Sequence, residues 1–545
     1  MNGAQKPQRE GRNAPCPCGS GLKWKKCHGA PPTTREGFLL EEQTIAAFVE
    51  RMRAQQLQRE QQQGLGKPII YAEFQGYRFV AVGSELLWSK DWRTFHDFLF
   101  AYLPRILGQD WGAEERGRSP DSWHPLFRLY EAVRVLRATH YVSGRTIQSA
   151  AMTGAAAAYL GLAYNLYLLA HNAAVQERLI KRLRHKDQFW PALYETSVAA
   201  KLIQAGFSLR LEEEADPSKT HCEFIATHRV SGRSFSVEAK YRQPNKEGFG
   251  VSNQLHAALK KSSDHPRIVF IDINVDARGT TSTNPFEVLP WLKGALESIR
   301  GREQTMTIRG LPAPPAYVIV TSEPYEACLN VNYAGLAFAA EGFKIADLKI
   351  DSAMTVREAR LARESHREIY ELLASMLRHQ QIPVTFDGEF PEFAFGETEE
   401  PRLIVGQEYL IPGPNGEDVI GVLEQAIANP ESAKAIGVYR LADGTQVLAT
   451  NPLTRAEVAA YKRHPETFFG TVSPSACKAN DPLDLYDFFF ETYGHAPREK
   501  LLDLISEHQD AEQLVGLTRE ELAILYCERL VEAAVYHAGG SPSTT

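Results

Sequence analysis

The chain has 545 residues, of which 43% are hydrophobic and 23% charged, and its net charge is -7 at neutral pH. This composition is typical of a globular protein with about two to four domains. It excludes a chain that is basic throughout, so a nucleic-acid-binding surface would have to be local.

The positions of the cysteines and the lengths of the apolar segments indicate in which cellular compartment the protein is expected. Cys222, Cys328, Cys477 and Cys527 are widely scattered, which favours reduced thiols in a cytoplasmic protein over a disulfide scaffold. Residues 1–11 are polar and do not resemble a signal peptide. The most apolar helix candidate, residues 155–170, is shorter than the ~20 residues of a membrane span. We therefore expect a buried core helix there and no membrane partner.

The first 36 residues contain three cysteines and a histidine in the spacing C-x-C-x8-C-H, namely Cys16, Cys18, Cys27 and His28. Thiolates and imidazole are the usual ligands of tetrahedral zinc, and four of them form a closed structural site. Residues 19–21, Gly-Ser-Gly, supply a tight turn between the ligand pairs. Seven Lys and Arg residues oppose two Glu residues in this segment, which gives it a charge of +5. The sequence predicts a basic, zinc-stabilised module at residues 1–36.

Residues 11–29 resemble the SEC-C motif, the zinc-binding module known from the tail of the SecA translocase ATPase. The matching residues are Arg12-Asn13, Pro15 to Gly21 and Lys25 to Gly29. The resemblance implies that Cys16, Cys18, Cys27 and His28 bind Zn²⁺. It also implies a structural zinc ion and a role in folding or in docking to a protein partner.

Residues 37–187 are predicted to be mainly helical. A polar helix is expected at residues 41–63 and a small hairpin at residues 69–82, before helices from residue 88 to residue 186. The basic run at residues 176–186 has two interpretations, a solvated helix face or a stripe that faces phosphates.

Residues 188–381 change to an α/β pattern. The expected elements follow in chain order: a helix at 190–205, strands at 222–227 and 234–241, a helix at 253–261, a strand at 268–271, a helix at 288–299, a strand at 316–320 and a long helix at 356–381.

The strand predicted at residues 234–241 contains two candidate catalytic residues, Glu238 and Lys240. Its alternation places Glu238 and Lys240 on one face, about 7 Å apart. Antiparallel pairing with the preceding strand would bring Glu223 close to Glu238. Two carboxylates and a backbone carbonyl suit Mg²⁺, and a neighbouring lysine can orient or help to deprotonate an attacking water molecule.

Residues 189–274 resemble the PD-(D/E)xK, or restriction-endonuclease-like, nuclease core in the order of these elements. The resemblance implies that Glu223, Glu238 and the carbonyl of Ala239 bind Mg²⁺. It makes Lys240 the catalytic lysine, Glu195 an auxiliary acid on the helix and Gln254 an accessory polar group. One departure is Glu223, since the family usually has Asp there; Asp216 is an alternative, but Pro217 follows it in a turn-like run.

The remaining chain is predicted to hold an acidic linker at residues 382–402, an α+β accessory region at residues 403–538 and a disordered tail at residues 539–545. Asp443-Gly444 indicates a hairpin turn. The predicted fold class is therefore multi-domain α+β and α/β, with a zinc module, a helical region, a nuclease-like core and an accessory region.

Two functions remain open at this point. One is metal-dependent phosphodiester hydrolysis of a nucleic acid. The other is a non-enzymatic adaptor, in which the zinc module binds a protein partner such as a chaperone, a ribosome or a translocase and the core is an inactive scaffold.

Overall fold

The computed structural model describes residues 42–539 apart from short gaps, and contacts divide the chain into two compact units, residues 1–53 and 54–545. The gaps are residues 144–146, 173–175, 212–221, 244–249, 277–288, 350–353, 396–401, 414–415, 474–481, 506–513 and 515. The predicted zinc ligands and residues 540–545 lie outside the described residues. The finer domain boundaries given above stay predictions.

The first described part combines helix α1 (Glu42–Gln63) with a three-stranded antiparallel sheet and a helical cluster. The strands are β1 (Tyr71–Phe74), β2 (Tyr77–Val82) and β3 (Glu85–Ser89). The helices are α2 (Phe95–Leu107), α3 (Gln109–Arg116), α4 (Pro125–Thr139), α5 (Gly154–Asn172) and α6 (Gln176–Leu183). The expected hairpin thus gains a third strand, because Gly83 adopts φ 58° and turns the chain back. The apolar helix α5 is buried, as predicted.

A six-stranded mixed sheet in the order β11-β10-β7-β6-β5-β4 forms the centre of the second unit. Its strands are β4 (Phe207–Leu211), β5 (Phe224–His228), β6 (Ser234–Tyr241), β7 (Arg267–Asp272), β10 (Ala316–Ser322) and β11 (Ala337–Phe343). Neighbours β6, β7 and β10 are parallel, whereas β4, β5 and β6 form an antiparallel meander. The predicted mixed α and β fold class is confirmed.

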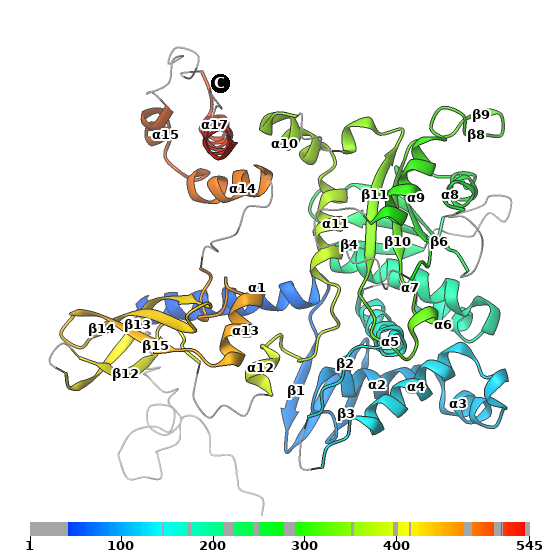
Figure 1. Cartoon of the computed structure of the whole chain (residues 1–545), viewed down its shortest axis with the longest axis horizontal. Coiled ribbons are helices and arrows are strands. Elements are labelled where there is room, and N and C mark those ends of the chain that lie inside the picture. The colour runs from blue at the N-terminus through cyan, green and yellow to red at the C-terminus, as the bar shows by residue number, and fades with distance from the viewer. Residues whose placement is uncertain are drawn as a thin grey trace, which may run out of the picture. The chain divides into compact units, whose positions relative to one another are not determined.

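Helices cover both faces of this sheet (Figure 1). Helices α7 (Phe189–Gln204) and α11 (Arg367–Arg378) pack on one face, and α8 (Val251–Leu259) and α9 (Pro290–Arg300) on the other. Every residue of β10 is buried, which is typical of a parallel strand between two helical layers.

One sequence prediction in this region was wrong in detail, and strands of the sheet were missed. The helix expected at residues 356–381 is interrupted at His366, which separates α10 (Val356–Ser365) from α11. His366 is buried and its Nδ1 lies 2.9 Å from the hydroxyl of Tyr317, so a tertiary contact holds the break. Strands β4 and β11 were not predicted, and β8 (Thr307–Ile308) and β9 (Leu311–Pro312) form a small separate hairpin.

The C-terminal part contains a four-stranded antiparallel meander and several helices. The elements are α12 (Pro391–Ala394), β12 (Glu408–Pro412), β13 (Asp418–Asn429), β14 (Lys434–Leu441), β15 (Gln446–Pro452), α13 (Arg455–Arg463), α14 (Pro482–Tyr493), α15 (Arg498–Ile505) and α17 (Arg519–Gly539). The turn at Asp443-Gly444 joins β14 to β15 as predicted, with Gly444 at φ 86°.

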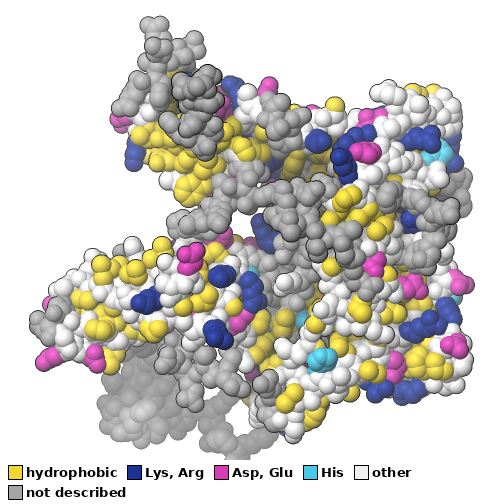
Figure 2. Space-filling model, viewed as in Figure 1, with side chains coloured by type: hydrophobic (Ala, Val, Ile, Leu, Met, Phe, Trp, Pro, Cys, Tyr) yellow, Lys and Arg dark blue, Asp and Glu magenta, His cyan; other side chains and the backbone are white. Residues whose placement is uncertain are grey.

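One face of this meander leaves aliphatic side chains exposed (Figure 2). They are Leu410, Ile420, Ile427, Ile436 and Leu448. In the part of the chain that the structure describes, no helix is long and apolar enough to cross a membrane.

Candidate functional site

The register of β5 and β6 places two predicted acids side by side. Phe224 pairs with Val237, and the backbone N–H of Glu223 donates to the carbonyl of Val237 at 3.0 Å. Glu223, directly before β5, therefore lies opposite Glu238 on the same face of the sheet. The proximity expected from the sequence is what the hairpin produces.

Two lysine ammonium groups bind the Glu238 carboxylate. The Nζ of Lys240 lies 2.5 Å from Glu238 Oε1, and the Nζ of Lys261 lies 2.8 Å from the same oxygen. Lys261 Nζ also lies 3.2 Å from Glu223 Oε1, so it bridges the two carboxylates. Sequence reasoning missed Lys261 as a site residue, because nothing in its local pattern distinguishes it from a solvated lysine at a helix end.

Glu238 is held in a nearly dry environment. Its side chain is buried, with a residue exposure of 1%, and its Oε2 has no hydrogen-bond partner among the described residues. Burial raises the pKa of Glu238, and the positive charges of Lys240 and Lys261 offset only part of that effect. For Lys261, burial would lower the pKa, but the carboxylates of Glu238 and Glu223 outweigh it and the pKa is raised. The result is a compact cluster of paired charges.

The helix acid Glu195 lies near this cluster but binds another partner. It is buried on α7, and Arg182 of α6 binds both of its oxygens, with Nη2 2.7 Å from Oε1. Burial raises the pKa of Glu195, and the carboxylates of Glu223 and Glu238 raise it further, against the lowering effect of Arg182. The three acids therefore influence one another electrostatically, while their predicted roles as metal ligands and auxiliary acid stay predictions.

The donor set of this cluster suits a hard divalent cation only in part. Among the described residues, no group of three or more His, Cys, Asp or Glu could hold a metal ion. Glu223 and Glu238 are the two carboxylates present, and Glu238 Oε2 accepts no hydrogen bond from any described residue. Gln254 lies half-buried in the first turn of α8. The alternative acid, Asp216, lies outside the described residues.

A second polar cluster, which the sequence did not suggest, lies between α7 and the carboxyl ends of β7 and β10. Lys201 Nζ lies 2.6 Å from Glu323 Oε1, and Ser197 Oγ donates to the same carboxylate at 3.1 Å. Asp272 Oδ1 accepts a hydrogen bond from the backbone N–H of Glu323 at 3.0 Å, while Asp272 Oδ2 has no partner in the part of the chain that the structure describes. Burial, followed by the charge of Glu323, raises the pKa of Asp272 to about 8.

This shift makes stability depend on pH. Because the folded pKa of about 8 exceeds the ordinary value of 3.8, the stabilisation from the Asp272 proton is complete below pH 3.8 and is lost as the pH rises to 8. Asp272→Asn has no carboxyl proton to lose, so the wild type should lose about 2 kcal/mol of unfolding free energy relative to this variant between pH 6 and pH 8. Urea unfolding at both pH values measures this, with the exposed-site variant Asp264→Asn as the control. Parallel pH profiles for wild type and Asp272→Asn would contradict the burial argument.

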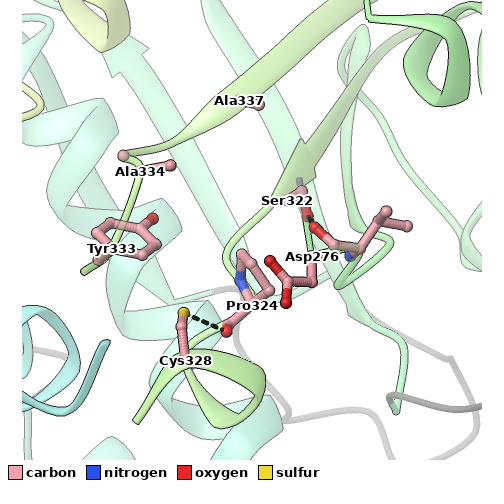
Figure 3. Close-up of a pocket in the computed structure, with 9 residues that line it drawn as sticks. Asp276, Ser322, Pro324, Cys328, Tyr333, Ala334 and Ala337 are labelled. Carbon is pink, nitrogen blue, oxygen red and sulfur yellow. Dashed lines mark hydrogen bonds between the residues drawn. The ribbon is translucent and has the colours of Figure 1, made fainter. Parts of the chain in front are cut away.

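A small cavity lies beside this cluster, where β7 and β10 end (Figure 3). Asp276, Ser322, Pro324 and Tyr333 contribute to its lining, and Cys328 Sγ donates to the carbonyl of Pro324. Its volume of about 10 Å³ is about that of one water position. It cannot hold a nucleotide or another substrate of that size.

Comparison with known proteins identifies one segment, since residues 12–30 match the family described as the SEC-C motif. The chain carries a SEC-C motif. A stretch of 20 residues is 90% identical to protein translocase subunit SecA 1 of Thermobifida fusca, and 23 residues are 78% identical to SecA of Acinetobacter baumannii strain AYE. Each match covers 4% of this chain, and the chain spans only 2% of the length of either relative.

The SEC-C motif contains all four predicted zinc ligands, Cys16, Cys18, Cys27 and His28, and lies outside the described residues. No solved structure matches the chain. The resemblance of residues 189–274 to PD-(D/E)xK nucleases therefore gains no support from these comparisons. It rests on the order of the elements and on the cluster around Glu238.

Proposed function

We propose that this chain is a metal-dependent nuclease that hydrolyses phosphodiester bonds in a nucleic acid and carries a zinc-stabilised SEC-C module. The observation that carries the proposal is the position of Glu223 and Glu238 across the β5–β6 pair, with Lys240 on the same strand. Glu195 on α7 adds a third acid to the same electrostatic environment.

In this proposal, Glu223, Glu238 and the Ala239 carbonyl hold Mg²⁺. A bound cation of this kind polarises a phosphodiester and stabilises the negative charge that develops on it. Lys240 orients the attacking water molecule, since its ammonium is already positioned beside Glu238. Arg182 holds the carboxylate of Glu195 in place through two hydrogen bonds.

The surroundings of the site support a polyanionic substrate. Arg182 belongs to the basic run at residues 176–186, and its contact with Glu195 places α6 beside the acids. Lys181 on the same helix is exposed. In the proposed function, Lys181 contacts phosphate groups, whereas Arg182 is paired with Glu195.

The test is a cleavage assay of the purified full chain on single- and double-stranded DNA and RNA with Mg²⁺ and Mn²⁺, beside Lys240→Ala. We expect cleavage by the wild type that the variant and EDTA both abolish. Intact substrates in every combination, or equal cleavage by Lys240→Ala, would overturn the proposal.

A second candidate is the adaptor, favoured by the SEC-C motif and by its relatives, which are named translocase subunits. Here Cys16, Cys18, Cys27 and His28 bind structural Zn²⁺ and the module docks onto a protein partner in the cytoplasm. Co-purification of one partner with the wild type, but not with Cys16→Ser, together with an absence of nuclease activity, would favour this function.

A further inference from the structure

The position of Lys261 has a consequence for how a cation can enter the site. Its ammonium lies between Glu223 Oε1 and Glu238 Oε1, at 3.2 and 2.8 Å. An ion shared by these two carboxylates would have to lie in the same place. Lys240, by contrast, contacts Glu238 from its own strand.

We propose that the Lys261 ammonium occupies the cation position between Glu223 and Glu238, and that a divalent cation binds there only after Lys261 has moved away. The inference rests on the proposed function for the assignment of these acids as metal ligands. It adds a regulatory element to that site, since Lys261 competes with the metal ion.

Charge balance supports displacement. Among the described residues, the carboxylates of Glu195, Glu223 and Glu238 are paired with three cationic side chains, Arg182, Lys240 and Lys261, so these formal charges cancel. A divalent cation added to this buried cluster would leave an excess of two positive charges at low dielectric, which is unfavourable. One of the cationic side chains therefore has to leave as the metal enters.

Lys261 is the side chain whose departure frees both carboxylates, because it contacts Glu223 and Glu238 whereas Lys240 contacts Glu238. It follows the end of α8 at Leu259, and its side chain is 22% exposed on a flexible four-carbon stem. Arg182 is fixed by two hydrogen bonds to Glu195, and Lys240 is anchored within β6. Glu238 Oε2 is an acceptor that neither lysine uses and that has no partner among the described residues, so a metal ion would gain a ligand atom there.

The test is Mn²⁺ binding, measured by electron paramagnetic resonance on the zinc-loaded full chain. Lys261→Gln should bind Mn²⁺ about tenfold more tightly than wild type, the range typical of coupled sites. Lys260→Gln, an equal charge change at the exposed neighbouring residue, should bind like wild type. The double variant Glu238→Gln/Lys261→Gln should not show this tighter Mn²⁺ binding, because it lacks one of the two carboxylates. Lys261→Met is a second variant to use if Lys261→Gln folds poorly.

The outcomes separate this inference from the proposed function. The proposed competition between Lys261 and the metal ion is wrong if both Lys261→Gln and Lys261→Met bind Mn²⁺ no more tightly than Lys260→Gln. This holds whether or not the wild type cleaves nucleic acid. Tighter binding by both variants supports it, even where every substrate stays intact and the nuclease proposal fails.

Discussion

Glu238→Gln is expected to lower metal-dependent cleavage by about a thousandfold. The substitution keeps the shape of the side chain but removes the charge that both Lys240 and Lys261 contact. An amide is a weak ligand for Mg²⁺, so the site would lose one of its two carboxylates. Initial rates on the preferred substrate, at saturating Mg²⁺, give the measurement.

The matched control is Glu297→Gln. Glu297 is exposed on α9, which covers the same face of the sheet as α8. It makes the same charge change away from the cluster and should cleave like wild type. Circular dichroism and thermal unfolding test whether Glu238→Gln is folded, since Lys240 loses its ion pair with Glu238 and Lys261 keeps the one with Glu223. A folded Glu238→Gln that cleaves as fast as Glu297→Gln would exclude Glu238 from the reaction.

The sequence predicted the strand that carries the site better than it predicted the contacts within it. Strict alternation over β6 determined the face of Glu238 and Lys240, and the turn after β5 determined that Glu223 would approach. Lys261 and Arg182 could not be found in this way. Each side chain reaches its carboxylate because a helix packs against the sheet or against another helix. The residue spacing at a helix end or in a basic run does not predict such a contact.

The same reasoning explains the missed strands. Segment β11 is rich in Ala and Gly, residues with weak strand preference, and it is a strand because it pairs along β10 from Ala316 to Ser322. Segment β4 starts directly after Gly206, whose φ of 88° reverses the chain, and its partner β5 begins beyond a gap. In both cases the pairing partner, and not the local sequence, decides the structure.

Removal of zinc is the other change with a large expected effect. It concerns residues 12–30, which are distant in the sequence from the residues of the candidate site. Four ligands within thirteen residues leave so small a module with almost no apolar core, so metal binding has to supply its folding free energy. Apparent zinc-binding free energies of such modules are about 10–16 kcal/mol, far above the net stability of a segment this size. Chelation should therefore unfold residues 12–30 while the second unit, residues 54–545, keeps its thermal transition.

Elemental analysis should find about one zinc ion per chain in the wild type and none in Cys16→Ser or His28→Ala. Cys328→Ala removes a buried thiol outside the motif and should keep the zinc. Limited proteolysis then locates the change, because a chelator should add cleavage sites within the motif alone. Zinc retained by Cys16→Ser, or loss of the main thermal transition on chelation, would contradict an independent module. In the proposed function, the zinc site and the Glu238 cluster use different ligand types, soft thiolates against hard carboxylates, and cleavage that survives zinc removal would show that the SEC-C module takes no part in the chemical step.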